Sequence, residues 1–386
     1  MRDAVICAAV RTPVGKRGGG LSGVHAVDLS AHVLESLVER AGIDPAVIED
    51  VIWGCVSQVG EQTFNIARSA ALAAGWPESV PGTTVDRQCG SSQQSVAFAA
   101  ATVISGQADV VVAGGVEMMS RVPMGSASNP ASGAGRPMGP KFAERYDGVT
   151  INQGVGAEMI AERWGFSRTQ LDEFALSSHE KAAKAQADGA FEEEIAPVTT
   201  PEGLVSADEG IRPGGTLEKL GSLKTPFKEG GVISAGNASQ ISDGSAALLV
   251  TTSEKARELG LTPLVRIHTT VMAGDDPVIM LTAPIPATKK LLDRSGLSID
   301  DIGVYEVNEA FAPVPLAWLA ETGANPDRLN PHGGAIALGH PLGGSGARLM
   351  TTLIHQMRAT GSRYGLQTMC EGGGMANATI LELIDA

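Results

Sequence analysis

Residues 85–94 read Val85 Asp86 Arg87 Gln88 Cys89 Gly90 Ser91 Ser92 Gln93 Gln94, a polar turn that carries one of the four cysteines of the chain. A pattern rich in Ala and Val, with helical spacing, follows this turn and ends near Gly106. Cys89 is therefore predicted to lie at the N-terminus of a helix. The helix dipole and the backbone amides at such a position favour the thiolate, which makes Cys89 a candidate nucleophile.

A second cysteine, Cys370, occupies a comparable position near the end of the chain. It follows a strand-like segment at 364–369 and precedes Glu371 Gly372 Gly373 Gly374, a turn whose backbone amides can approach a ligand closely. Cys7 and Cys55 lie in or at the edge of apolar runs, so we expect them to be packed thiols.

The composition excludes several classes of protein. With 386 residues, 43% of them hydrophobic, the chain can bury a large core and form more than one packed unit. Its net charge of −14 disfavours nucleic acid and anionic membranes as partners. The sequence has no CxxC pair, so neither a zinc site nor a disulfide framework is expected, and no metal is predicted. No apolar run is long enough to span a membrane.

Two segments of the chain repeat one order of elements. A helix from Cys89 to Gly106 precedes a strand at 110–113 and two glycines, and a helix from Gly346 to Gly361 precedes a strand that reaches Cys370 and its glycines. We interpret this repeat as an internal duplication of an α/β unit. The predicted organisation is an N-terminal half at 1–117, an insert at 118–247, a return to the core at 248–263, and a C-terminal half at 264–386.

The insert departs from the α/β pattern. Its segment 123–140 is rich in Gly, Ser, Pro and Met, which predicts a mobile loop, and 167–187 has the spacing of an amphipathic helix. The small and turn-forming residues at 234–244 form either a plain turn or a surface that lets a large ligand approach the backbone. A local basic patch, either an anion site or a solvated loop, consists of Arg212, Lys219, Lys224 and Lys228.

Two further motifs lie on loops near predicted strand ends. Asn308 Glu309 Ala310 Phe311 follows a strand at 302–307, and His340 lies in the glycine-rich stretch 333–346. Ligands bind at the carboxyl ends of strands in open α/β sheets, so both motifs and both cysteines are expected to converge. A cysteine nucleophile needs a base, and a histidine with a pKa near neutrality can supply it. The stretch 343–346 follows no strand of a dinucleotide-binding unit and is predicted to be a turn.

Taken in order, these motifs resemble those of the thiolases, the acyl-CoA C-acetyltransferases, over nearly the whole chain from Arg11 Thr12 Pro13 to Gly374. The resemblance implies an α/β thiolase fold with two duplicated βαβαβαββ halves in an α/β/α/β/α layered arrangement and an inserted loop domain. It implies an acyl-CoA thiolase, which cleaves a 3-ketoacyl-CoA with CoA or runs the reverse Claisen condensation. CoA is then a substrate, and no permanently bound cofactor is expected.

The resemblance also implies roles for individual residues. Cys89 resembles the nucleophile that takes the acyl group, His340 its base, and Cys370 the second acid/base. Asn308 resembles the residue that holds a water which, with His340, stabilises the thioester oxyanion. The backbone amides of Cys89 and Gly372 resemble the other oxyanion hole. The positions that resemble substrate and CoA contacts are Arg212, Ser239, Met280, Phe311 and Ala310, although Met280 and Phe311 could equally be core and Arg212 a surface cation.

Three departures from the family pattern predict an altered acyl pocket. Asn152 Gln153 stands before Gly154 where acetoacetyl-specific members carry His Met, His332 stands where Asn is more frequent, and Gly374 is followed by Met375 Ala376 Asn377 where a further glycine is usual. Together with Gln88, Gln93 and Gln94 beside Cys89, these changes resemble those of bacterial thiolases that handle bulky or polar acyl chains, including steroid fragments.

Two other classes share the fold. A decarboxylating ketoacyl synthase typically has a histidine in place of the second cysteine, so Cys370 argues against it. A non-catalytic lipid or sterol carrier would lose the nucleophile, so Cys89 argues against that class. The thiolase interpretation predicts a cytoplasmic homodimer or homotetramer, because two-fold assembly is usual, with acyl-CoA and CoA as partners and neither nucleic acid nor membrane.

Overall fold

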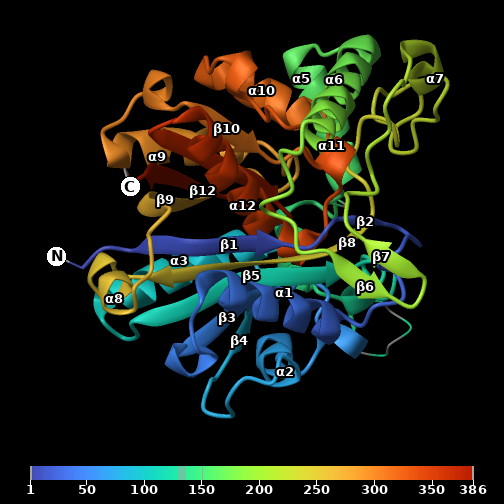
Figure 1. Cartoon of the computed structure of the whole chain (residues 1–386). Coiled ribbons are helices and arrows are strands. Elements are labelled where there is room, and N and C mark those ends of the chain that lie inside the picture. The colour runs from blue at the N-terminus through green and yellow to red at the C-terminus, as the bar shows by residue number, and fades with distance from the viewer. Residues whose placement is uncertain (1, 130, 132, 134, 150, 385–386) are drawn as a thin grey trace.

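The computed structural model describes residues 2–129, 131, 133, 135–149 and 151–384. Its centre is a sheet with the strand order β10-β11-β12-β9-β1-β8-β5-β3-β4, to which β2 (Gly15–Lys16) adds beside β8. This sheet consists of two half-sheets that meet between β1 and β9 at the pairs Val5↔Arg266 and Ile6↔Val265. In Figure 1 the N-terminal half (blue to cyan) lies below and the C-terminal half (orange to red) above.

The two half-sheets repeat one pattern of strand pairing. The order β3, β5, β8, β1 in the first corresponds to β10, β11, β12, β9 in the second. In each half the first pair is parallel and the next two are antiparallel. The predicted duplication is therefore confirmed. The bounds are β1 Val5–Arg11, β3 Asp50–Gly54, β5 Val110–Met118, β8 Ser242–Thr251, β9 Val265–Gly274, β10 Val304–Val307, β11 Tyr364–Glu371 and β12 Met375–Leu383.

The halves differ at their outer edge. In the first half, β4 (Thr83–Val85) pairs in parallel with β3 and completes the βαβαβαββ order. In the second half, the corresponding place is held by a single parallel bridge, Tyr305↔Leu329. The duplicated unit is thus complete in the first half and shortened in the second.

Helices complete the predicted α/β/α/β/α layers (Figure 1). Helices α3 (Ser91–Ser105) and α12 (Leu342–Thr360) pack against each other between the half-sheets. The outer face of the first half is covered by α1 (Ala26–Ala41) and α2 (Ile66–Ala73), and that of the second by α9 (Pro284–Ser295) and α10 (Pro313–Thr322). Short α8 (Ser253–Glu258) connects β8 to β9.

Helix α12 begins at Leu342, whereas the sequence predicted a start at Gly346 and a turn before it. The glycines of this stretch lie inside the helix because other backbones approach it closely. A Cβ on Gly343 would lie 2.7 Å from Cys55 Cα, and one on Gly346 would lie 2.4 Å from Gln93 N. The stretch 343–346 is therefore a packing surface for the first half and for α3.

A buried carboxylate fixes the start of α12 to the first half. Glu117 in β5 accepts hydrogen bonds from Gly343 N at 2.9 Å, Val56 N at 3.0 Å and Ser57 N at 3.1 Å. Burial raises the pKa of Glu117, and these amide donors lower it. The loop that carries His340 is thereby held against the half that carries Cys89.

The insert runs between β5 and β8 and covers parts of both halves. Its helices α5 (Gln153–Trp164) and α6 (Arg168–Ala187), green in Figure 1, pack on α10 and on α11 (Ala335–Leu338). Helix α6 begins at a capping box formed by Ser167 and Gln170, close to the predicted start. The remaining elements of the insert are α4 (Pro140–Arg145), the hairpin of β6 (Val198–Thr200) and β7 (Gly203–Val205), and α7 (Leu217–Gly221).

The division of the chain into halves and insert at 117, 247 and 263 stays a prediction. Strand β8 begins at Ser242, so the sheet resumes a few residues before the predicted end of the insert. The loop predicted to be mobile at 123–140 includes positions 130, 132 and 134, which lie outside the described residues.

Candidate active site

Cys89 lies in the turn between β4 and α3. The Ser91 hydroxyl fixes this turn because it donates to Gln88 O at 2.6 Å and accepts from Arg87 N at 2.9 Å. Gln88 has a φ of +48°, a left-handed conformation that turns the chain sharply before the helix. Cys89 is 4% exposed. Its apolar neighbours are Met119, just after β5, Leu342 in α12 and Met369 in β11.

The position of Cys89 before a helix does not make it a resting thiolate. Burial, and secondarily the Glu371 carboxyl, raise the pKa of Cys89 to about 12. Hydrogen bonds from its own amide, the Gln153 side chain and the Gly372 amide lower this pKa by less. Burial therefore opposes the thiolate that the helix terminus favours. The thiol needs a base when it reacts.

Cys370 is the penultimate residue of β11, inside the strand rather than after it. The Asn308 side chain hydrogen-bonds its sulfur, while burial and the charge of Cys89 raise the pKa of Cys370. The glycine turn follows, with φ of +88° at Gly373 and +75° at Gly374, and it directs the Gly372 amide toward the Cys89 sulfur. The two sulfurs, one from each half, are thus neighbours.

Asn308 connects the second cysteine to the histidine. Its backbone N–H donates to Thr368 O at 3.1 Å, which fixes the residue just beyond β10. Its side-chain Nδ2 lies 3.4 Å from His340 Nε2. Its Oδ1 is buried and has no hydrogen-bond partner among the residues that the structure describes. The structure therefore brings Cys89, Cys370, Asn308 and His340 into one group.

The hydrogen bonds of His340 define its tautomer. Ser345 Oγ donates to Pro341 O at 2.8 Å, so it accepts from His340 Nδ1 at 2.6 Å. Nε2, on the Asn308 side, is then the unprotonated nitrogen. Burial, and secondarily Arg348, lower the pKa of His340 to about 3, well below the near-neutral value expected from the sequence. The ring is neutral at physiological pH and can accept a proton at Nε2.

Sequence reasoning missed two buried residues that hold this group in place. Ser345 orients His340, and its position one helical turn into α12 is the signal that could have identified it. Glu309 joins the loop after β10 to α6 and α11. Its carboxylate accepts from Ser178 Oγ at 2.7 Å, Asn330 Nδ2 at 2.8 Å and Ile336 N at 3.2 Å.

The predicted acyl-pocket residues lie beside Cys370. Met280, Ala310 and Phe311 are buried and share one apolar cluster with Cys370 and with residues of α5. Met280 has a φ of +63°, and Phe227 packs edge to face on Phe311 at 6.1 Å. The structure thus brings these positions together next to the second cysteine.

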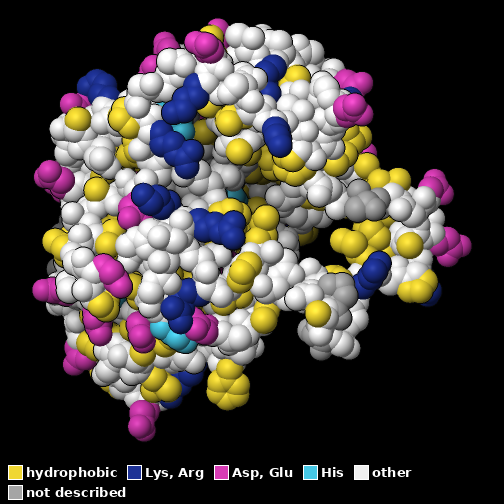
Figure 2. Space-filling model, turned by 90° about the vertical axis from the view of Figure 1, so that its right-hand side faces the viewer, with side chains coloured by type: hydrophobic (Ala, Val, Ile, Leu, Met, Phe, Trp, Pro, Cys, Tyr) yellow, Lys and Arg dark blue, Asp and Glu magenta, His cyan; other side chains and the backbone are white. Residues whose placement is uncertain are grey.

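The predicted CoA contacts lie further from the sulfurs. Ser239 N donates to Ala310 O at 2.9 Å, which joins the 234–244 stretch to the acyl cluster. Arg212 is exposed and its Nη2 donates to Gln240 Oε1 at 3.3 Å, while Lys228 pairs with Glu162 at 2.9 Å. Figure 2 shows the side of the molecule that carries α7. On this side, Lys and Arg side chains lie beside hollows with hydrophobic walls.

Of the three departures from the family pattern, one reaches the nucleophile. Gln153 begins α5, where the Asn152 side chain caps the helix, and it hydrogen-bonds Cys89. His332 instead packs edge to face on Phe191 at 5.8 Å, in a different apolar cluster from Met280, so the expectation that it alters the acyl pocket is wrong. Gly374 O accepts from Asp275 N at 2.7 Å in the turn itself.

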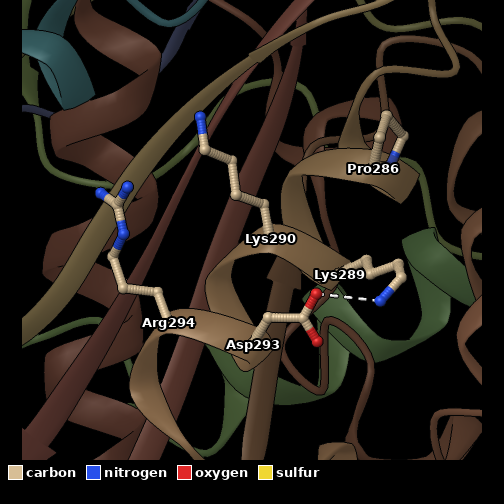
Figure 3. Close-up of a pocket in the computed structure, with 5 residues that line it drawn as sticks. All are labelled: Pro286, Lys289, Lys290, Asp293 and Arg294. Atoms are coloured by element: carbon tan, nitrogen blue, oxygen red, sulfur yellow. Dashed lines mark hydrogen bonds and ion pairs between the residues drawn. The ribbon is translucent and has the colours of Figure 1, made fainter.

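Other features of the described residues do not add to the site. No group of three or more His, Cys, Asp or Glu side chains among them could hold a metal ion, and no helix among them is long and apolar enough to cross a membrane. An open concavity of about 440 Å³ lies on α9, where Lys289 pairs with Asp293 at 2.9 Å (Figure 3). The residues that line this concavity are Pro286, Lys289, Lys290, Asp293 and Arg294, and none of them is a predicted site residue.

Comparison with known proteins assigns the class. The chain matches the N-terminal domain of thiolases over residues 4–254 and the C-terminal domain over residues 261–383. It therefore belongs to the thiolase family and is an acyltransferase, an acyl-CoA thiolase whose substrates are acyl-CoA and CoA.

Individual relatives are similar over nearly their whole length. The chain is 51% identical to the steroid 3-ketoacyl-CoA thiolase FadA6 of Mycobacterium tuberculosis, over 99% of this chain and 94% of that protein. It is 46% identical to the beta-ketoadipyl-CoA thiolase of Escherichia coli over 100% of both. Its structure matches the crystal structure of the Bacillus anthracis acetyl-CoA acetyltransferase with a TM-score of 0.91 at 39% identity, covering 100% and 99% of the two chains. These likenesses confirm the thiolase fold.

Proposed function

We propose that this thiolase works through an acyl-Cys89 intermediate in a ping-pong cycle, with His340 as the base for Cys89 and Cys370 as the acid/base for the α-carbon. The observation that carries the proposal is the grouping of these residues: Asn308 hydrogen-bonds Cys370 and lies 3.4 Å from His340 Nε2, and Cys89 is close enough to act electrostatically on Cys370. Each group comes from a different element, and the neutral Nε2 of His340 is the nitrogen that faces the group.

The thiolysis direction illustrates the proton balance. Cys89 loses its proton to His340 Nε2 and attacks the 3-keto carbon, and the bond between the α- and β-carbons breaks. The enolate of acetyl-CoA takes a proton from Cys370 and leaves. The thiol of CoA then gives its proton to Cys370 and attacks acyl-Cys89. The shortened acyl-CoA departs while Cys89 recovers its proton from His340.

Two groups of donors support the charged intermediates. The amides of Cys89 and Gly372 both point to the Cys89 sulfur, where the oxygen of an acyl group on that sulfur would develop negative charge. On the other side, the unpartnered Oδ1 of Asn308 supports its role as the holder of a water that, with His340, faces the thioester oxygen of acetyl-CoA.

The CoA moiety is proposed to run over the exposed basic side of the insert. Arg212 and Ser239 are the contacts, supported by the direct link of Ser239 to Ala310 and by the exposure of Arg212. Met280, Ala310 and Phe311 are proposed to line the acyl end, because they share a cluster with Cys370.

The acyl substrate is proposed to be bulky or polar, including steroid-derived chains. Gln153 supports this because a primary amide, rather than an apolar side chain, lies against the nucleophile. The name of the 51% identical relative, a steroid 3-ketoacyl-CoA thiolase, supports the steroid class. A panel of 3-ketoacyl-CoA esters from acetoacetyl to polycyclic, compared by kcat/KM for thiolysis, tests this proposal. Acetoacetyl-CoA as the best substrate would refute it.

Peptide mass spectrometry tests the intermediate. After incubation with acetyl-CoA and acid quenching, we expect an acetyl mass shift on the peptide that contains Cys89, and none on the peptides that contain Cys55 or Cys370. Iodoacetamide should likewise remove activity by modifying Cys89, and acyl-CoA should protect it. A protein that binds acyl-CoA without any acylated peptide would instead be the carrier of thiolase fold.

Assembly and location are part of the proposal. A homodimer or homotetramer is supported by the exposed edge region beside β4, where Phe64 is 91% exposed with a φ of +57°. Light scattering of the purified protein checks the subunit number, and an odd number would contradict two-fold assembly. A cytoplasmic location, without nucleic acid or membrane as partner, is proposed on the net charge of −14.

A further inference from the structure

Glu371 is a buried acid placed against the turn that carries Cys89. Successive side chains of a strand point to opposite faces, so Cys370 and Glu371 of β11 face different layers. Cys370 faces the acyl cluster with Phe311. Glu371 faces the helix layer, where a Cβ on Gly90 would lie 2.0 Å from Glu371 Oε1. The carboxyl therefore fills the space that a side chain at position 90 would need.

Burial and the lack of well-formed hydrogen bonds disfavour a negative charge on this carboxyl. Glu371 is 0% exposed, and neither of its carboxyl oxygens has a well-formed hydrogen bond among the described residues. The Asn377 side chain, which packs at the same place, is engaged with Gly90 O at 2.9 Å. A buried carboxyl without donors is more stable in its neutral form.

The charged groups that face Glu371 come from the turn before α3. Arg87 favours the ionised form, and Asp86 opposes it. The Arg87 guanidinium is partly engaged elsewhere, since Nη1 lies 3.9 Å from Met375 Sδ and its buried Nε has no partner among the described residues. Burial remains dominant and raises the pKa of Glu371 to about 8, although Arg87 and the Asn377 backbone N–H lower it.

The charge state of Glu371 acts directly on both sulfurs. Its ionised form raises the pKa of Cys89 and also that of Cys370. Cys89 must carry negative charge when it attacks, and Cys370 must carry it after it protonates the enolate. A negative charge at Glu371 opposes both steps.

We propose that Glu371 is a positioning residue whose charge state controls the reactivity of the two sulfurs. While its carboxyl is neutral both sulfurs stay reactive, and when the carboxyl ionises at alkaline pH the thiolysis activity falls. The inference rests on the proposed function, in which Cys89 is the acylated nucleophile. Its sign follows from the raised pKa: the carboxyl is neutral below that pKa and charged above it, so the inhibition appears as pH rises.

The pH profile of thiolysis in the full-length enzyme tests the inference. Between about pH 6.5 and about pH 9.5, wild-type kcat/KM should show an alkaline fall of about tenfold, because a nearby negative charge opposes the thiolate of Cys89. Glu371→Gln keeps the shape of the side chain but cannot ionise. We expect the variant to lie within about twofold of wild type at the acid end and about tenfold above it at the alkaline end.

Glu306→Gln is the matched control. Glu306 is also fully buried, and burial raises its pKa to about 8, but it lies in β10 against Gln356 and Arg348. The control should keep the wild-type alkaline fall. An unchanged fall in Glu371→Gln, or its loss in Glu306→Gln alone, would overturn the inference.

A measurement on the wild type keeps the inference testable if Glu371→Gln does not fold. The rate of Cys89 alkylation by iodoacetamide should rise about tenfold per pH unit below about pH 8, flatten as Glu371 ionises, and then rise again. A straight line through this range would overturn the inference. If acetyl-CoA acylates a residue other than Cys89, the proposed function fails; if it acylates Cys89 and the profiles of wild type and Glu371→Gln coincide, only this inference fails.

Discussion

The two cysteines lie at different places in the duplicated unit, Cys89 before helix α3 of the first half and Cys370 in strand β11 of the second, and they differ in the groups that surround the sulfur. Cys89 precedes a helix, and backbone amides of two elements point at its sulfur. Cys370 lies inside a strand, and a side chain, Asn308, connects it to His340. Amide donors suit an acyl group whose oxygen becomes negative, and a side-chain relay suits a proton that moves. One repeated scaffold thus provides two unlike environments for the same atom.

Replacing each of the two cysteines by serine tests this difference and should have the largest effect on activity. Cys89→Ser should lower kcat for thiolysis by about 10⁴-fold or more, since it removes the nucleophile. Cys370→Ser should lower it by about 10² to 10⁴-fold, the range for a general acid/base, while Cys89 is still acylated by acetyl-CoA. Cys55→Ala, at a packed thiol, is the control for both. Loss of acylation in Cys370→Ser would show that the two sulfurs do not have separate roles.

Asn308→Ala should have the next largest effect, because Asn308 belongs only to the Cys370 side of the comparison. Loss of one oxyanion donor costs about 10² to 10³-fold in kcat. We expect this loss in steady-state thiolysis, together with slower exchange of the α-protons of acetyl-CoA with deuterium. Normal deuterium exchange with reduced thiolysis would place Asn308 on the Cys89 side instead.

Ser345→Ala should have a smaller effect, because it acts through His340. A buried group that loses its partner costs about 1 to 3 kcal/mol, which corresponds to about 5- to 160-fold in kcat/KM. Ser95→Ala in α3 removes the same kind of bond, from Ser95 Oγ to Ser91 O at 3.0 Å, without a histidine. Equal losses in the two variants, measured side by side, would mean that Ser345 only supports its helix.

The smallest effects concern the packing of the two halves. A Cβ on Gly54 of β3 would lie 2.4 Å from Ser92 N, whereas one on Gly365 of β11 would meet the flexible Met357 Sδ at 2.5 Å. Gly54→Ala should therefore reduce the free energy of unfolding by about 3 kcal/mol and Gly365→Ala by about 1 kcal/mol, within the range for overpacked cores. Urea unfolding of both variants measures the difference, and the reverse order would contradict a tighter first half.

Sequence reasoning identified the fold because its signals are local. The helix predicted at 167–187 is α6 at Arg168–Ala187, and the order of strands and glycines exposed the duplication. The glycines at the start of α12 were misassigned to a turn. They are needed inside the helix because Cys55 and Gln93, from distant parts of the chain, approach its backbone closely. A pattern along the chain contains no information about such approaches.

The group of Cys89, His340, Asn308 and Cys370 was predicted through resemblance, and the structure brings these residues together. Their protonation could not be predicted. A helix terminus predicts a thiolate at Cys89, but the burial that raises its pKa depends on Leu342 and Met369 from the other half. Glu371 was read only as part of a glycine turn, since its contact with Gly90 joins positions far apart in the chain.

The return of β8 to the first half-sheet has a consequence for how the chain folds during synthesis. Strand β8 lies between β1 and β5 in the sheet. These two strands therefore cannot be joined into one sheet until the ribosome has released residues up to Thr251. The first half must therefore wait for the whole insert before its sheet closes, and its apolar edges stay open meanwhile. The C-terminal half, which has no comparable interruption between β9 and β12, can complete its sheet soon after it emerges.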